Sequence, residues 1–155
     1  MATREHADEL LSGGKRKKGL AELRECVDQC RANPEGCPPV QIAGLLGHLA
    51  YEIRMDRKTG MPYYGKYKEE ADALITEAQQ LLEASDERPD GSAWMAWHGV
   101  ARRLALMDGD PFRAVQYSHE LIRRIEALPD GDTAVLDQLR ELHHRDGVQH
   151  RPWIG

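Results

Sequence analysis

The sequence predicts an all-α protein built from helical hairpins, and three observations lead to this fold class. Apolar residues recur at intervals of three and four along nearly the whole chain, which is the period of an amphipathic helix. No run of alternating Val, Ile, Thr or Tyr indicates a strand. A spacing of small and medium-sized residues at positions i, i+4 and i+7 occurs three times, in Gly19-Leu23-Cys26, Ala71-Ile75-Ala78 and Ala114-Ser118-Leu121.

The first hairpin is predicted over residues 3–12 and 16–32. Gly13-Gly14 separates the two helices, and Asn33-Pro34 ends the second one, because proline lacks an N–H and disfavours helix in the residue before it. The inward faces are Ala7, Leu10 and Leu11 in the first helix, and Leu20, Leu23, Cys26, Val27 and Cys30 in the second.

The second hairpin is predicted over residues 39–55 and 66–84. Pro38-Pro39 opens it, since proline is tolerated in a first helical turn. Gly60, Pro62 and Gly65 mark the segment between the helices as a loop. The inward faces are Ile42, Leu45, Leu46, Leu49, Ala50 and Ile53, followed by Ala71, Leu74, Ile75, Ala78, Leu81 and Leu82.

The third hairpin is predicted over residues 92–107 and 111–128, after a linker at 86–92, with a tight turn at Asp108–Pro111. Its inward faces are Trp94, Trp97, Ala101 and Leu104, then Ala114, Val115, Tyr117, Leu121, Ile122 and Ile125.

A seventh helix begins at a capping Asp132 or Thr133 and repeats Val135, Leu136, Leu139 and Leu142 at helical spacing. The segment from His143 to Gly155 is polar. We therefore predict one helical-repeat domain over residues 1–146 and a C-terminal tail over residues 147–155.

Composition narrows the classes of function. A chain of 155 residues has the length of one domain. Its net charge of −5 argues against a molecule that binds nucleic acid over its whole surface. No apolar run approaches the length of a membrane span, and the N-terminus lacks an apolar signal core, so we expect a cytoplasmic protein. The three cysteines are then expected to be reduced.

The chain resembles the tetratricopeptide-repeat (TPR) family. In the first and third hairpins, a small residue follows a glycine of the turn at the same distance. The second hairpin has a Leu-Gly pair followed by a small residue, and the third begins with tryptophans. The residues that carry the resemblance are Gly14 with Gly19, Leu46-Gly47 with Ala50, Trp94 or Trp97, and Gly109-Asp110 with Ala114. The resemblance implies a helical solenoid with the last helix as its polar cap.

The repeat is longer than that of the family. The period of the TPR family is about 34 residues, whereas Gly19, Ala71 and Ala114 are 52 and 43 residues apart. The additional residues fall in the 56–65 loop and the 86–92 linker. A generic bundle of helical hairpins is the alternative architecture.

The resemblance implies a non-enzymatic adaptor without a cofactor, which binds a peptide or helix of a protein partner. Its groove would be lined by the helices over 39–55 and 92–107. The residues expected to contact the partner are His48, Tyr51, Glu52, Met55, His98, Arg102 and Arg103. No Ser/His/Asp or Cys/His arrangement stands out, and we predict no catalytic residue.

Two further segments are candidates for binding. The loop from Asp56 to Tyr67 mixes cations with aromatic rings that could grip a peptide or a single nucleic-acid strand. Its candidate residues are Arg57, Lys58, Tyr63, Tyr64 and Tyr67. The run Lys15–Lys18 places four cations at a helix N-terminus, where they oppose the helix dipole, which hints at an anionic partner. An alternative function is therefore association with nucleic acid or with a transcriptional regulator. Self-association through Trp153 and Ile154 is a further alternative.

Metal binding is the remaining alternative, as part of a small helical metal protein or enzyme. Cys26 and Cys30 are one helical turn apart and Cys37 follows, but no fourth zinc ligand is evident. Glu141 and His144 match one half of a di-iron motif without its second half. We predict no metal site.

Overall fold

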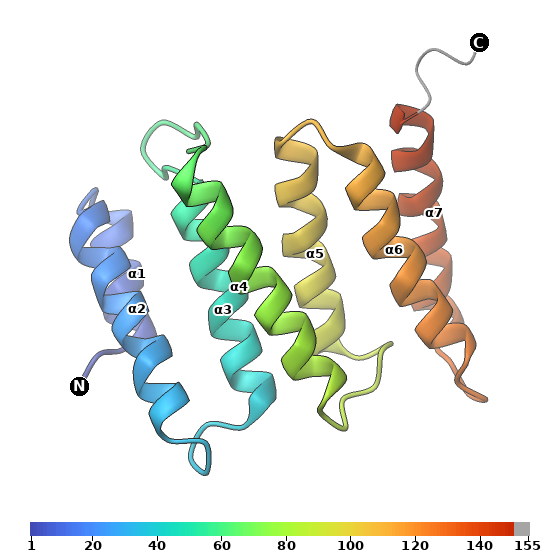
Figure 1. The fold of residues 1–155 in the computed structure, drawn as a ribbon, viewed down its shortest axis with the longest axis horizontal. Helices are drawn as coiled ribbons and strands as arrows, with labels where there is room; N and C mark the ends of the chain where they lie inside the picture. The colour runs from blue at the N-terminus through green and yellow to red at the C-terminus, as the bar shows by residue number, and fades with distance from the viewer. Residues whose placement is uncertain (151–155) are drawn as a thin grey trace. The chain divides into compact units, whose positions relative to one another are not determined.

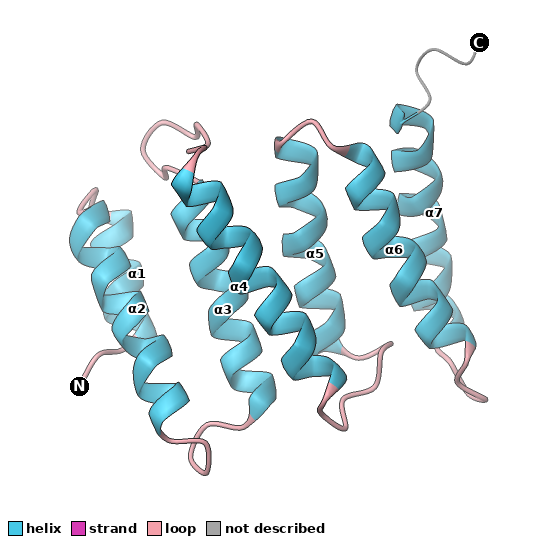
Figure 2. Ribbon diagram, in the orientation of Figure 1, coloured by secondary structure: helices cyan, strands magenta, loops and turns pink. Residues whose placement is uncertain are grey.

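The computed structural model describes residues 1–150, and the fold class predicted from the sequence is confirmed. Seven α-helices lie within this range, and the only β-type pairing there is an isolated bridge between Met55 and Pro62 (Figures 1 and 2). The chain divides after Asp86 into two compact units. None of the helices within residues 1–150 combines the length and apolar character needed to cross a lipid bilayer.

The first unit contains four helices, which pack in chain order, each against the next (Figure 1). They are α1 (Arg4–Ser12), α2 (Arg16–Ala32), α3 (Pro39–Arg54) and α4 (Lys66–Glu83). These bounds agree with the predicted helices to within one residue at each end, because Gly and Pro residues stand at the predicted breaks.

The second unit contains three helices, with α5 packed on α6 and α6 on α7. They are α5 (Ser92–Met107), α6 (Pro111–Glu126) and α7 (Thr133–His150). Trp94, Trp97 and Tyr117 form a chain of edge-to-face rings, with centroids 5.7 Å and 5.4 Å apart, between α5 and α6. Such pairs contribute more than their buried area alone.

The repeated spacing marks the buried side of the second helix in each hairpin. All three triplets are buried on α2, α4 and α6. Most of the other predicted stripe residues are buried as well. The half-buried ones are Leu10, Leu81, Val115, Tyr117, Val135 and Leu142. Small residues at these positions let neighbouring helices approach closely, as the spacing predicts.

The turns after α1 and α5 have the same construction. In each, a glycine with positive φ, Gly14 or Gly109, follows the last helical turn. The Lys15 N–H donates to the Leu10 carbonyl over 2.9 Å, and the Asp110 N–H donates to the Ala105 carbonyl over 3.0 Å. This is the Schellman motif, which satisfies carbonyls left free at a helix end.

The end of α7 differs from the prediction. The segment after His143 continues as helix through His150 rather than beginning a polar tail. The sequence pattern misses this part because the inward residue there is polar: Asp146 is completely buried. Trp153 and Ile154, proposed for self-association, lie outside the described residues.

Candidate functional site

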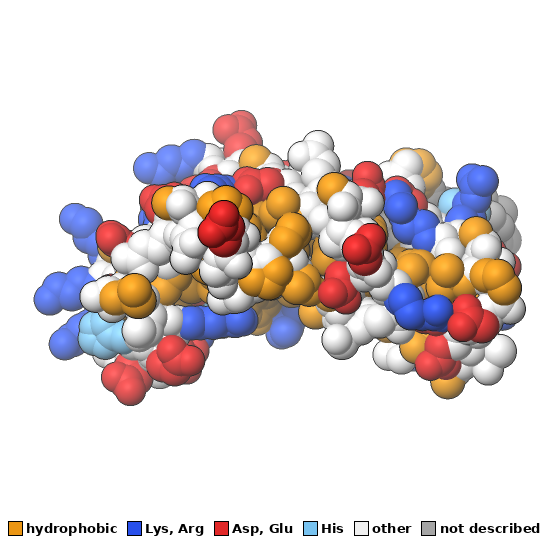
Figure 3. All heavy atoms as spheres, turned by 90° about the horizontal axis from the view of Figure 1, so that it is seen from below, with side chains coloured by type: hydrophobic (Ala, Val, Ile, Leu, Met, Phe, Trp, Pro, Cys, Tyr) orange, Lys and Arg blue, Asp and Glu red, His pale blue; other side chains and the backbone are white. Residues whose placement is uncertain are grey.

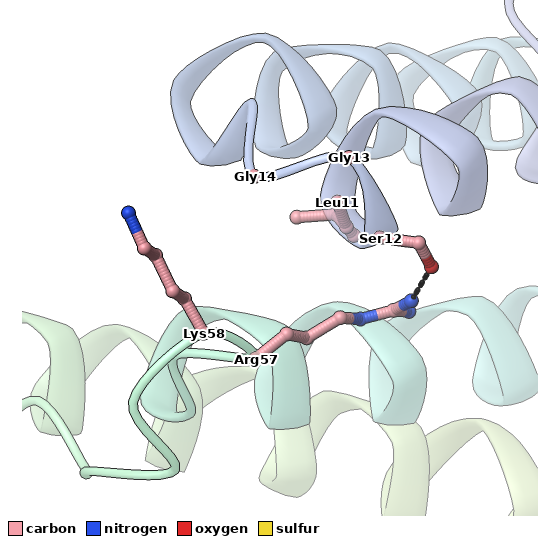
Figure 4. Close-up of a pocket in the computed structure, with 6 residues that line it drawn as sticks. All are labelled: Leu11, Ser12, Gly13, Gly14, Arg57 and Lys58. Carbon is pink, nitrogen blue, oxygen red and sulfur yellow. Dashed lines mark hydrogen bonds between the residues drawn. The ribbon is translucent and has the colours of Figure 1, made fainter.

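A pocket of the first unit lies between the α1–α2 turn and the α3–α4 loop. It has a volume of about 360 Å³ and is lined by Leu11, Ser12, Gly13, Gly14, Arg57 and Lys58. A neighbouring lobe of about 160 Å³ extends it towards Arg16, Asp56 and Tyr63. In Figure 4 the Lys58 side chain rises from the loop towards the Gly14 turn, and Arg57 extends towards Ser12. The basic run and the Tyr loop, distant in sequence, therefore meet at this pocket.

Asp56 gives the loop its shape. Its carboxylate accepts hydrogen bonds from the Lys58 backbone N–H at 2.9 Å and from the Tyr63 hydroxyl at 3.1 Å. The Lys58 N–H bond is the main reason that the pKa of Asp56 is lowered. Gly60, with φ of +69°, closes the turn and donates its N–H to the Asp56 carbonyl. The loop is thus an ordered hairpin whose tip presents Lys58.

Arg16 joins the basic run to the end of α3. Its guanidinium donates to the carbonyls of Glu52 at 2.6 Å and Ile53 at 2.7 Å. The same group stacks 4.2 Å above the centroid of the Tyr63 ring. A cation at the carbonyl end of a helix is favourable for the helix dipole. Arg16 therefore has a structural role and is not available to a ligand.

Arg57 connects the loop to α1 and α3. Its guanidinium binds Glu52 at 2.9 Å, Ser12 at 2.6 Å and the Asp8 carboxylate. Glu52 is 3% exposed, so Arg57 supplies the charge that a buried carboxylate needs. Hydrogen bonding to Arg57 lowers the pKa of Asp8. These contacts fix the wall of the pocket on its α1 side.

The remaining cations around the pocket have no such partners. Lys15, Lys17, Lys18 and Lys58 are exposed, and their ammonium groups make no ion pair within residues 1–150. The corner is thus positively charged, although the whole chain is acidic. Figure 3 views the other end of α1 and α2, where Lys and Arg side chains over these helices are interspersed with Asp and Glu side chains.

The N-terminus of α2 offers backbone N–H donors next to these lysines. Lys15 occupies the N-cap position and gives no side-chain hydrogen bond to the first turn. At the equivalent turn before α6, the Asp110 carboxylate caps the helix by accepting from the Arg113 N–H at 3.1 Å. Backbone N–H groups at a helix N-terminus, together with neighbouring cations, favour binding of an anion. The turns after α1 and α5 have the same backbone construction, but the first places a lysine at the following N-cap and the second an aspartate.

The predicted groove residues of α3 mostly contact the protein itself. The His48 Nδ1 accepts a hydrogen bond from Arg4 Nε at 2.7 Å, and burial lowers the pKa of His48. Glu52 is buried against Arg57. Tyr51 and Met55 are half-buried, and Tyr51 also has interactions within the protein.

The predicted groove residues of α5 lie in the second unit. His98 is 1% exposed, and its Nε2 lies 2.8 Å from the Ser118 Oγ. Burial lowers the pKa of His98 to about 4. Arg102 binds both oxygens of the buried Asp146 at 2.7 and 2.8 Å. Arg103 is exposed and has interactions within the protein. His98 and Arg102 therefore tie α5 to α6 and α7, and the groove across both units stays a prediction.

The tyrosines of the loop differ in exposure. Tyr63 and Tyr67 are half-buried, with ring centroids 5.4 Å apart, whereas Tyr64 is 55% exposed. Arg54, which is completely buried, donates to the Tyr63 carbonyl at 2.6 Å and lies 5.3 Å from the centroid of the Tyr64 ring. The sequence reasoning did not identify Arg54 as a determinant of the loop. The sequence feature that could have indicated Arg54 is its position as a charged residue at the end of an otherwise apolar helix stripe.

The metal alternatives gain no support. Among the side chains that the structure describes, no three from His, Cys, Asp or Glu are placed so that they could hold a metal ion. Cys26 and Cys30 are buried, Cys37 is half-buried, and all three are free thiols.

Comparison with known proteins gives no relative for this chain. No family model, no curated protein and no solved structure matches it. The resemblance to the TPR family therefore stays a prediction.

Proposed function

We propose that the protein is a non-enzymatic interaction module that binds an acidic segment of a protein partner at the pocket between the α1–α2 turn and the α3–α4 loop. The observation that carries the proposal is that Lys58 lines this pocket and that Lys15, Lys17 and Lys18 follow the lining residue Gly14 in the sequence. None of these four lysines makes an ion pair within the part of the chain whose side chains are described. We refer to Lys15, Lys17, Lys18 and Lys58 as the basic corner.

The side chains around the basic corner favour a ligand that carries several negative charges. Arg16, Arg54 and Arg57 are already engaged by the protein, so they hold the loop in place without an added ligand. The lysines, in contrast, are long and exposed. Each exposed ion pair contributes only about 0.2–1 kcal/mol, so a segment with several carboxylates suits the site better than a single one.

An acidic peptide fits these residues better than a nucleic-acid strand. Single-strand binding draws on aromatic rings over which successive bases stack. Here Tyr63 is covered by Arg16 and its hydroxyl binds Asp56, while Tyr67 lies against Tyr63. Tyr64 is the one largely exposed ring of this loop. The groups available to a ligand are therefore mainly positive charges and backbone N–H donors, both of which bind carboxylates.

Fluorescence polarisation with a labelled oligoglutamate peptide tests the proposal. The variant Lys15→Gln/Lys58→Gln removes one charge from each of the two segments that meet at the pocket, because Lys15 follows the lining residue Gly14 and Lys58 lines the pocket itself. We expect it to weaken binding by about fivefold or more, since two ion pairs are lost. The matched control is Arg123→Gln/Arg145→Gln, which removes the same net charge from exposed positions of the second unit. It should bind like the wild type.

Salt and a second probe complete the test. Binding should weaken as salt is raised to about 0.5 M, because exposed charges are screened. Equal affinity of both double variants for the peptide would contradict the proposal. Tighter binding of labelled oligothymidine than of oligoglutamate, lost in the Lys15→Gln/Lys58→Gln variant, would replace it by the nucleic-acid alternative.

A further inference from the structure

Two cysteines face each other at the opposite end of α2 from the basic corner. The Sγ atoms of Cys30 and Cys37 lie 2.6 Å apart, although both residues are free thiols. Cys30 is in the last turns of α2 and is 7% exposed, whereas Cys37 lies in the connection to α3 and is half-buried. The two sulfur atoms therefore need little movement to form a bond.

Asn33 builds the turn that brings the cysteines together. Its backbone N–H donates to the Cys30 carbonyl at 3.1 Å, and its carbonyl accepts from the Cys37 N–H at 2.9 Å. Its side-chain oxygen accepts from the Gly36 N–H at 3.2 Å. A β-carbon on residue 36 would stand 2.4 Å from the Asn33 Nδ2, so this packing leaves little room for another residue there. The fold thus holds Cys37 against Cys30 through local backbone bonds.

We propose that Cys30 and Cys37 are a redox-active thiol pair that forms a reversible intramolecular disulfide with a small-molecule disulfide as oxidant. The Cys37 thiolate attacks one sulfur of the oxidant, and the first thiolate of the oxidant leaves. The Cys30 thiolate then attacks the Cys37 Sγ, and the second thiolate leaves. Two cysteine thiols are oxidised, one disulfide is reduced to two thiols, and two protons pass to solvent and the leaving thiolates.

The different exposure of the two thiols sets the order of these steps. Cys37 is accessible to a molecule in solution, whereas Cys30 is covered by the hairpin. Burial, and then the hydrogen bond with Cys37, raises the pKa of Cys30 to about 11. Only a thiolate attacks a disulfide, so the second step, in which Cys30 is the nucleophile, should be slow near neutral pH and faster as pH rises.

Cys26 does not compete for Cys30. The two residues are one turn apart on α2, where β-carbons are about 5–6 Å apart. A disulfide needs about 3.5–4.5 Å between these atoms. Cys26 is also buried, and burial raises its pKa. The variant Cys26→Ala therefore isolates the proposed pair and leaves it intact.

The experiment equilibrates Cys26→Ala protein in buffers with stepped ratios of oxidised to reduced glutathione, then blocks the remaining thiols and measures mass. We expect a product lighter than the dithiol by two hydrogen atoms. Trypsin cuts after Arg31, between the two cysteines, so the disulfide should join two peptides that separate on reduction. Wild-type protein should give the same product, with Cys26 alkylated.

Two comparisons decide the proposal. The native protein should form the disulfide at a glutathione ratio at least about tenfold less oxidising than the same protein in denaturant, because the fold places the thiols together. Asn33→Ala should shift that ratio by about threefold or more towards the denatured value, since a hydrogen bond that shapes the turn is lost. Equal ratios for native and denatured protein, or accumulation of a glutathione adduct on Cys37 without ring closure, would overturn the proposal.

Discussion

Gly19 of α2 lies directly against Leu11 of α1. A β-carbon on residue 19 would stand 2.6 Å from the Leu11 Cγ and 3.1 Å from the Leu11 backbone nitrogen. An added methyl group would have to displace the Leu11 side chain, and the nearby backbone nitrogen of Leu11 limits the room for that movement. Gly19 is also the first residue of the repeated spacing in the sequence, so the spacing here reports a real limit on how closely the hairpin can pack.

We predict that Gly19→Ala destabilises the protein by about 1–2 kcal/mol. Forcing an extra methyl group into a packed site costs about 1–3 kcal/mol, and a gain in helix propensity of up to about 1 kcal/mol offsets part of this. Urea denaturation measures the difference. Gly44 is the matched control: it lies on the exposed side of α3 with no atom within 4 Å of an added β-carbon. Gly44→Ala should stabilise the protein, and destabilisation by both changes would contradict the packing argument.

Arg16 and Lys17 are neighbours in the basic run, and we expect opposite results from replacing them. Arg16→Gln removes the donors that bind the Glu52 and Ile53 carbonyls and the stacking on Tyr63. It should cost about 1.5–3 kcal/mol, as expected for hydrogen bonds made by a charged group. Lys17→Gln, at an exposed position, should stay within about 0.5 kcal/mol of the wild type. Equal unfolding midpoints for the two variants would show that Arg16 does not stabilise the end of α3.

The helices and their buried faces could be predicted because they depend on local signals. Period, proline and glycine are read directly from the chain, and the structure places the ends of α2, α3 and α5 within one residue of the predicted positions. The end of α7 could not be predicted in this way. Its inward residue, Asp146, is tolerated in the interior only because Arg102 of α5 approaches it, and that pairing joins positions 44 residues apart.

The candidate site was predictable only in pieces. The basic run and the Tyr loop each attracted notice in the sequence, but no sequence rule indicates that Gly14 and Lys58 line one pocket. The role of individual cations was also hidden. In the sequence, Arg16, Arg57 and Arg102 are positively charged residues like the lysines. In the structure, each of these arginines is bound by other groups of its own unit. Only the three-dimensional contacts separate structural cations from those open to a ligand.

Breaking the ion pair between Arg102 and Asp146 should be among the most destabilising single changes in the second unit. Arg102→Met leaves a completely buried carboxylate without its counter-charge, so we expect a loss of about 3–5 kcal/mol in the free energy of unfolding. The double variant Arg102→Met/Asp146→Leu removes both charges and should recover most of that loss. Denaturant titration of four proteins, namely the wild type, Arg102→Met, Asp146→Leu and the double variant, measures this cycle. Additive effects of the two single changes would mean that the residues do not act as a pair.

His98 should make stability depend on pH between about 4 and 6.5. In the folded protein burial holds its pKa at about 4, whereas an unfolded histidine titrates near 6.5. Within this window the unfolded chain binds a proton that the folded chain does not, so the free energy of unfolding falls as pH falls. The loss approaches about 1.4 kcal/mol per pH unit and ends below the folded pKa, where both states are protonated.

The variant His98→Gln separates this effect from the other titrating groups. It should be less stable than the wild type at pH 7, because the Ser118 hydroxyl loses its partner at 2.8 Å. The difference should shrink by about 2 kcal/mol between pH 7 and pH 4.5, since only the wild type must keep residue 98 neutral. His144→Gln, at an exposed position of α7, is the control for loss of one imidazole. A constant difference between wild type and His98→Gln across this range would show that the proton equilibrium of His98 is the same in the folded and unfolded protein.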